Sequence, residues 1–177
     1  MRFFGIVALC VLASIVYGIL HDQVTARVCV EYFTLGHPRI IESESPTLLA
    51  FAWGVVATWW MGLFLGILVA LFSCVGHRPT LGPRDLLRPM AILLGVMAAL
   101  ALLAGIAGYA AAKDGRVILL PPLAERLPRV RHAAFIADLW AHRASYATGL
   151  LGAIVLCKRI VVWRRRRGAT NPPAQPA

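Results

Sequence analysis

Six side chains that can bind a metal ion or exchange a proton stand in three short stretches of this sequence. Asp138 and His142 are four residues apart, so on a helix they would share one face with Tyr146. Histidine nitrogens combined with carboxylate oxygens suit zinc or non-haem iron. No spacing matches a compact motif such as H-E-x-x-H, and the ligands would come from distant segments. The candidate metal ligands are His21, Asp22, Glu31, His37, Asp138 and His142.

The same side chains have a structural interpretation, which the sequence favours. Polar residues that flank apolar runs can form a hydrogen-bonded network that holds loops against helix ends. No Ser/His/Asp or Cys/His arrangement points to a nucleophile, so we predict no catalytic residue and no cofactor. The expected members of the polar network are Arg27, Glu31, Arg131, Asp138, His142 and Tyr146.

Four apolar runs must position these residues, at 3–20, 48–75, 90–112 and 144–163. Each is close to the roughly 20 residues that a helix needs to cross a bilayer. The chain is 59% hydrophobic and only 15% charged, the reverse of a soluble protein. We therefore predict an all-α, four-helix membrane domain over 1–167, with a disordered tail over 168–177.

The ends of two runs allow alternatives. The first run is longer than the apolar core of a signal peptide, about 7–15 residues, so an uncleaved helix is favoured over a cleaved one. The fourth span has two possible frames, 145–163 and 139–157. The first is favoured; the second would draw His142 and Arg143 into the membrane, where an ionisable group needs a partner.

Charges between the runs predict the orientation. If both termini are cytoplasmic, the inner segments carry ten basic residues and one acidic residue, whereas the outer segments carry eight and seven. This distribution follows the positive-inside rule and indicates a multi-pass protein of the cell membrane, the inner membrane if the source is bacterial. The basic end should attract anionic lipids rather than nucleic acid. Its anchoring residues are Lys158, Arg159, Arg164, Arg165, Arg166 and Arg167.

The outer loops, 21–47 and 113–143, are expected to form a small cap. Apolar residues alternate from Val24 to Tyr32, which favours a strand, although a continuing helix fits because no Gly or Pro intervenes. A second strand is expected over 116–120. The two strands would pair into a short β-ribbon.

Small residues in the second and fourth runs predict close helix packing within the chain. These are Gly62 with Gly66 and Gly149 with Ala153. The adjacent Trp59 and Trp60 lie near mid-span by residue count. We expect them to pack against a neighbouring helix, with a ligand-facing wall as the alternative.

The loop reading H-D-Q-x-T-A-R…E-Y-F-T…G-H-P, from His21 to Pro38, is the most distinctive part of the chain. With the segment 138–146, it resembles a group of small four-span bacterial membrane proteins of uncharacterised activity. The resemblance implies an integral membrane protein and carries over no activity, cofactor or catalytic residue.

Three functions remain open at this level. The favoured one is a non-catalytic interaction or accessory protein, with a possible protein partner in the membrane. The second is a metal-binding protein or enzyme that uses the His, Asp and Glu residues of the cap. The third is a small transporter or channel, which is disfavoured because the spans contain almost no charged residue and no inverted repeat.

Overall fold

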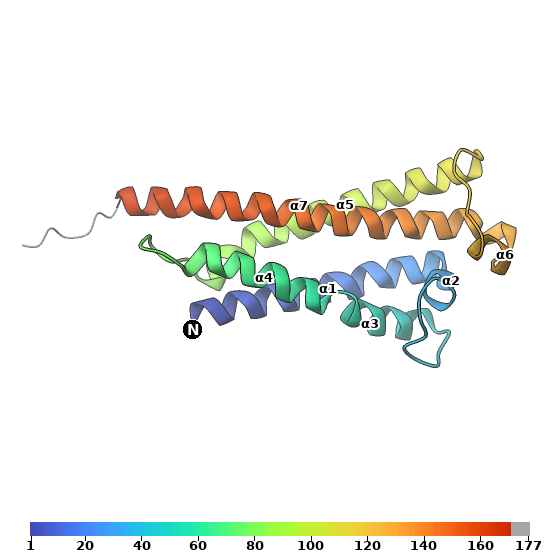
Figure 1. Cartoon of the computed structure of the whole chain (residues 1–177), viewed down its shortest axis with the longest axis horizontal. Coiled ribbons are helices and arrows are strands. Elements are labelled where there is room, and N and C mark those ends of the chain that lie inside the picture. The colour runs from blue at the N-terminus through green and yellow to red at the C-terminus, as the bar shows by residue number, and fades with distance from the viewer. Residues whose placement is uncertain (171–177) are drawn as a thin grey trace, which may run out of the picture.

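The computed structural model describes residues 1–170 and shows an elongated bundle of helices (Figure 1). Four helical segments are long and apolar enough to cross a membrane. The prediction of an all-α fold with four membrane-length helices is therefore confirmed. The four segments are α1 (Arg2–Val28), α3 with α4 (Pro46–Val56 and Trp59–Cys74), α5 (Pro83–Lys113) and α7 (His132–Thr170).

Three short helices lie at one end of the bundle, which we call the capped end. They are α2 (Val30–Thr34), α6 (Leu123–Arg126) and the 3-10 turn η1 (Arg129–Arg131). The opposite end, which we call the basic end, holds the start of α1, the 75–82 turn and the last turns of α7 (Figure 1). Residues 168–170 belong to α7, and the rest of the predicted tail lies outside the described residues.

The predicted β-ribbon is wrong, because no strand occurs within residues 1–170. The first segment, 24–32, belongs to α1 and α2, which meet at the extended residue Cys29 (φ −149°, ψ 92°). Val24 and Val28 face outward, at 60% and 40% exposure, so the apparent alternation combined two faces of a helix. The second segment, 116–120, is irregular. The buried side chains around the first segment follow helical spacing: Asp22, Thr25, Ala26 and Cys29.

The second apolar run is broken at Ala57 and Thr58. The Thr58 hydroxyl donates to the Gly54 carbonyl at 2.5 Å, and the Thr58 amide donates to Val55 rather than to the carbonyl four residues back. Such back-bonding by threonine bends helices. The bend separates α3 from α4. Trp59 and Trp60 begin α4 and are nearly half exposed, so about half of each side chain is covered within the chain and their predicted packing stays a prediction.

Two helix pairs form the bundle. α1 packs along α3 and α4, and α5 crosses behind α7 (Figure 1). Glycines allow the first pair to approach closely, since a Cβ atom on Gly62 or Gly66 would lie 2.8 Å from Ser14 or Cys10 of α1. Gly149 and Gly152 face Met97 and Leu93 of α5 in the same way. The small residues therefore serve packing inside the chain.

Arg164 joins the two pairs at the basic end. Its side chain is buried, and its guanidinium donates to four backbone carbonyls at 2.6–2.9 Å. These carbonyls close the end of α4 and the following turn, where no helical N–H group is available to them. The acceptors are the carbonyls of Phe72, Val75, Arg78 and Pro79.

Candidate functional site

Polar faces of α1 and α7 meet just below the cap. On α1, Tyr17, His21 and Asp22 follow helical spacing, and on α7 His142 and Ser145 do the same. The Tyr17 hydroxyl lies 2.8 Å from the Ser145 hydroxyl, and Nε2 of His142 lies 3.2 Å from a carboxylate oxygen of Asp22. These contacts bring residues more than a hundred positions apart to one place.

A backbone carbonyl decides how the ring of His142 is protonated. Nδ1 of His142 lies 2.8 Å from the carbonyl oxygen of Asp138, and a carbonyl can only accept, so Nδ1 carries the proton. In a neutral ring Nε2 then presents a lone pair toward the Asp22 carboxylate. The side chains of His142 and Asp22 are only 13% and 7% exposed. A proton or a metal cation must lie between these two groups, because two buried lone pairs repel each other.

His21 adds a second imidazole beside the pair. Its Nε2 atom is buried and has no hydrogen-bond partner within the described residues. The ring stacks on Tyr17 and meets the His142 ring edge-on, with centroids 4.6 Å apart. One ligand atom from each of His21, Asp22 and His142 lies within 4.8 Å of the other two. The three residues thus form a small cluster, which we call the His–Asp–His cluster.

Aromatic rings from α2 and α3 enclose the cluster. Tyr32 stacks on His142 with centroids 4.5 Å apart, and Phe33 approaches the same ring at 5.8 Å. Burial raises the pKa of the Tyr32 hydroxyl, so Tyr32 stays neutral. His37 lies behind this wall, where Nδ1 donates to the Tyr32 carbonyl at 2.8 Å and the ring contacts Trp53. His37 therefore supports the wall and is not part of the cluster.

Glu31 takes a structural position beside the cluster. Arg131 donates to both of its carboxylate oxygens at 2.8–3.2 Å and also to the carbonyl of Val28. These hydrogen bonds lower the pKa of Glu31. The buried thiol of Cys29 donates to the same carboxylate at 3.3 Å, and burial raises the pKa of this thiol to about 12. The ion pair ties the junction of α1 and α2 to the start of α7.

The other members of the predicted polar network lie apart from one another. Arg27 points away from the cluster and donates to Gln23 and Thr47. Asp138 is 1% exposed, and its Oδ2 atom has no hydrogen-bond partner within the described residues. Tyr146 lines the cavity beside the cluster and remains partly exposed. The structure therefore separates the expected network into the Glu31–Arg131 ion pair, His142 in the His–Asp–His cluster, and three separate side chains, Arg27, Asp138 and Tyr146.

A cavity of about 130 Å³ leads from the cluster into the bundle between the two helix pairs. Its polar atoms are concentrated near the cap, where the cluster and Tyr17 lie. Toward the basic end the walls are apolar and include Met61, Met97 and Ala153. The cluster therefore faces a small, mostly apolar space rather than open solvent.

Sequence reasoning missed Tyr17, Ser145 and Trp53 as parts of this site. Tyr17 and Ser145 fall inside the apolar runs 3–20 and 144–163, so the hydrophobicity of their neighbours predicts only a membrane span there. Their spacing was the available signal, because Tyr17 precedes His21 by four residues and Ser145 follows His142 by three.

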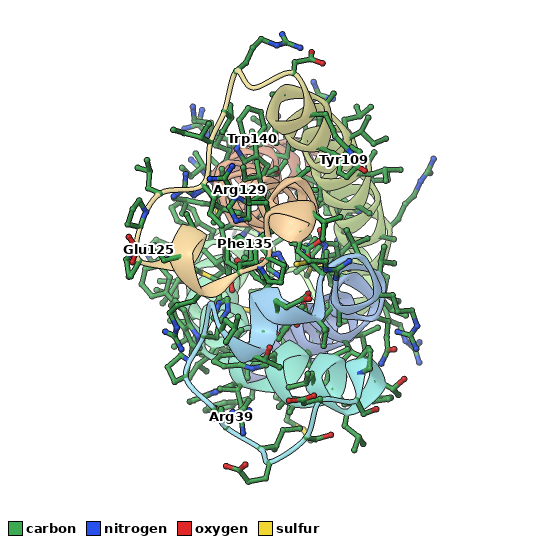
Figure 2. The ribbon with its side chains drawn as sticks, turned by 90° about the vertical axis from the view of Figure 1, so that its right-hand side faces the viewer. Arg39, Tyr109, Glu125, Arg129, Phe135 and Trp140 are labelled. Carbon is green, nitrogen blue, oxygen red and sulfur yellow. The ribbon has the colours of Figure 1, made fainter. Side chains whose placement is uncertain are left out.

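Figure 2 looks onto the capped end, with Phe135 near the middle, between the start of α7 and the short α2 helix. The rings of Phe135 and Tyr32 lie 5.3 Å apart there, which closes the site from above. Arg39 lies on the long connection between α2 and α3, away from the centre of this end (Figure 2).

In comparisons with family models, curated proteins and solved structures, nothing matches this chain. The resemblance of its loop therefore stays a prediction. The residues that carry the resemblance nevertheless gather at one place: His21 and Asp22 in the cluster, Tyr32 and Phe33 in its wall, and His37 behind the wall.

Proposed function

We propose that this multi-pass membrane protein binds a divalent transition-metal ion at the His–Asp–His cluster. The observation that carries the proposal is the convergence of three potential ligand atoms at a mostly buried site, where Nε2 of His21 has no hydrogen-bond partner within residues 1–170. A cation satisfies all three at once, whereas a single proton can bridge only the pair of His142 and Asp22.

The surroundings of His142 support a metal over a proton. Histidines that bind metals usually donate their other N–H group to a carbonyl or carboxylate, which fixes the ring. The Asp138 carbonyl does this for His142 at 2.8 Å. Two imidazoles and one carboxylate suit zinc, iron(II) or a related ion.

With three protein ligands, a bound zinc ion would have room for a water or a substrate as a further ligand. The cavity lies beside the cluster and supplies the space for such a ligand. Tyr17 lies at the same level and could position it. A non-catalytic accessory role is the alternative function, and it would apply if the cluster binds no metal.

We further propose that both termini are cytoplasmic and that the metal site lies on the outer side of the cell membrane. The support is the excess of basic residues at the end of the bundle opposite the cluster. The ion would then be acquired from outside the cytoplasm.

Metal content tests the proposal. The protein, purified with a tag that contains no histidine and without chelator, is expected to retain about one equivalent of a first-row transition metal by elemental analysis. Substituting either imidazole, His21→Ala or His142→Ala, should abolish retention because two ligands do not hold the ion. His77→Ala is the matched control, since this exposed histidine lies at the basic end. Less than about a tenth of an equivalent in the parent protein would overturn the proposal.

Thermal unfolding with added zinc distinguishes a variant that has lost the metal site from one that has lost its fold. Added zinc should raise the thermal unfolding midpoint of the chelator-treated parent protein, because a ligand that binds only the folded state stabilises it. Asp22→Asn keeps the size of the side chain but weakens the site, so zinc should shift its midpoint much less. Equal shifts for Asp22→Asn and the parent would place the metal elsewhere.

A further inference from the structure

A second cavity, independent of the metal site, opens between α5 and α7 at the basic end of the bundle. It measures about 930 Å³ and lies between the first turns of α5 and the last turns of α7. We call this cavity the groove. Most of the side chains that line it are either cationic or apolar. Its cationic residues are Arg84, Arg88, Lys158, Arg159 and Arg166.

The charge of this groove is strongly one-sided. Asp85 is the acidic residue of its lining, and its two oxygens already accept the Gly82 amide at 2.8 Å and Arg167 at 2.9 Å. The groove also lies at the N-terminus of a 31-residue helix, whose dipole places further positive charge there. An anion entering the groove thus meets several cations and a carboxylate that is already neutralised.

The apolar part of the lining extends from the cations toward the middle of the bundle. Leu86 and Ile160 are fully buried at its base, whereas Ile92 and Val162 are about half exposed along its sides. Trp163 lines the same groove and packs its ring under the Arg167 guanidinium at 4.6 Å. Tryptophan is typical of the level where lipid headgroups meet acyl chains.

We propose that this groove binds an anionic phospholipid, with its phosphate among the cations of α5 and α7 and its acyl chains along Ile92 and Val162. Basic pockets between membrane helices bind phosphate-bearing headgroups. A free phosphate would satisfy the cations but leave the apolar sides uncovered, so a lipid fits both parts of the lining. The assignment holds for either orientation of the protein, because the basic end lies at the headgroup level of one leaflet or of the other.

Lipid retention by the whole protein in detergent tests the proposal. Native mass spectrometry should show phosphatidylglycerol bound in preference to phosphatidylcholine with the same acyl chains. The double variant Arg84→Gln/Arg159→Gln should weaken phosphatidylglycerol binding by about tenfold or more, since each surface cation contributes appreciably to the attraction of anionic lipids. Both arginines are exposed, so their loss leaves the fold intact.

Arg126→Gln/Arg129→Gln is the matched control, because it removes two exposed arginines at the capped end. It should bind phosphatidylglycerol as the parent does. Equal weakening by both double variants, or equal binding of the two lipids, would overturn the groove assignment. Displacement of the lipid by millimolar inorganic phosphate alone would identify a phosphate site instead. Chelator treatment should change none of these results, which keeps this test separate from that of the metal site.

Discussion

His142 shows how one backbone carbonyl can determine the chemistry of a side chain. The Asp138 carbonyl holds the Nδ1 proton of His142 and thereby turns the Nε2 lone pair toward Asp22. Tyr32 stacks on one face of the ring. The same imidazole on an exposed helix would exchange protons with solvent. Here the ring is held in one orientation, with Nε2 toward the Asp22 carboxylate.

The ion pair between Glu31 and Arg131 gives a pH-dependent prediction. The pKa of Glu31 is lowered in the folded protein, so its carboxylate stabilises the fold above the ordinary pKa of glutamate, and this stabilisation is lost as the pH falls through the lowered value. At pH 7, Glu31→Gln should cost about 0.5–1 kcal/mol, because the pair is partly exposed. Thermal unfolding of variant and parent should converge in acid.

Glu42→Gln is the control, because Glu42 pairs with Arg39 on the surface and is 85% exposed. It should leave the unfolding midpoint unchanged at every pH. A difference between Glu31→Gln and the parent that stays constant from neutral to acidic pH would contradict the assigned role of the ion pair.

At the scale of elements, the contact between α1 and α3 has almost no spare space. Gly18 and Gly54 face each other, and a Cβ atom on Gly54 would lie 2.5–2.6 Å from the backbone of Ile19. The Thr58 hydroxyl bonds the Gly54 carbonyl in the same region, so the bend between α3 and α4 is built at the closest approach. This packing fixes α1, and with α1 the direction of His21 and Asp22.

Gly54→Ala is therefore expected to destabilise the bundle by about 1–3 kcal/mol, because the helix backbones must separate to admit the methyl group. Thermal unfolding in detergent measures the effect. The matched control is Gly95→Ala in α5, where a Cβ atom meets nothing within 4 Å. This control should be neutral or stabilising by up to about 1 kcal/mol, from helix propensity alone. Equal stability of the two variants would contradict the packing described for α1 and α3.

At the scale of the whole molecule, polar contacts join the two helix pairs at both ends, and a cavity lies between the pairs. Asp22 with His142 and Glu31 with Arg131 join the pairs at the capped end. At the basic end Arg164 does so, together with the hydrogen bond from Arg2 to Thr80, which closes the 75–82 turn against α1. The cavity of about 130 Å³ lies between these two sets of contacts.

The orientation of this bundle can be measured with reporters. Met1 and residue 170 lie at the same end of the structure, so reporters at the two termini should report the same side (Figure 1). A fluorescent protein active only in the cytoplasm should therefore be active when fused at either terminus, as the positive-inside rule predicts. A phosphatase active only outside should work when inserted between Glu42 and Ser43, in the exposed connection after α2. The reverse pattern would invert the topology.

The sequence predicted the long helices well because hydrophobic length is a property of composition. It did not predict the bend at Thr58, where the hydroxyl bonds the Gly54 carbonyl, nor the identity of the polar partners. Charge and spacing predicted that six candidate ligands lie near one end of the bundle. Which of them meet depends on how α1 packs against α7, and three of the six come together. Glu31 was a candidate ligand and instead pairs with Arg131. Such choices depend on contacts between segments a hundred or more residues apart.

Arg164 also has a consequence for biosynthesis. The carbonyls that it caps at the end of α4 are made up to 92 residues before it. At translation rates of about 5–20 residues per second, α4 emerges roughly 5–20 seconds before its cap exists. The first three spans must therefore wait in the membrane for the last one, and a ribosome that stalls before Arg164 leaves an uncapped intermediate. The order of synthesis therefore determines when the carbonyls at the end of α4 receive the guanidinium of Arg164 as their hydrogen-bond donor.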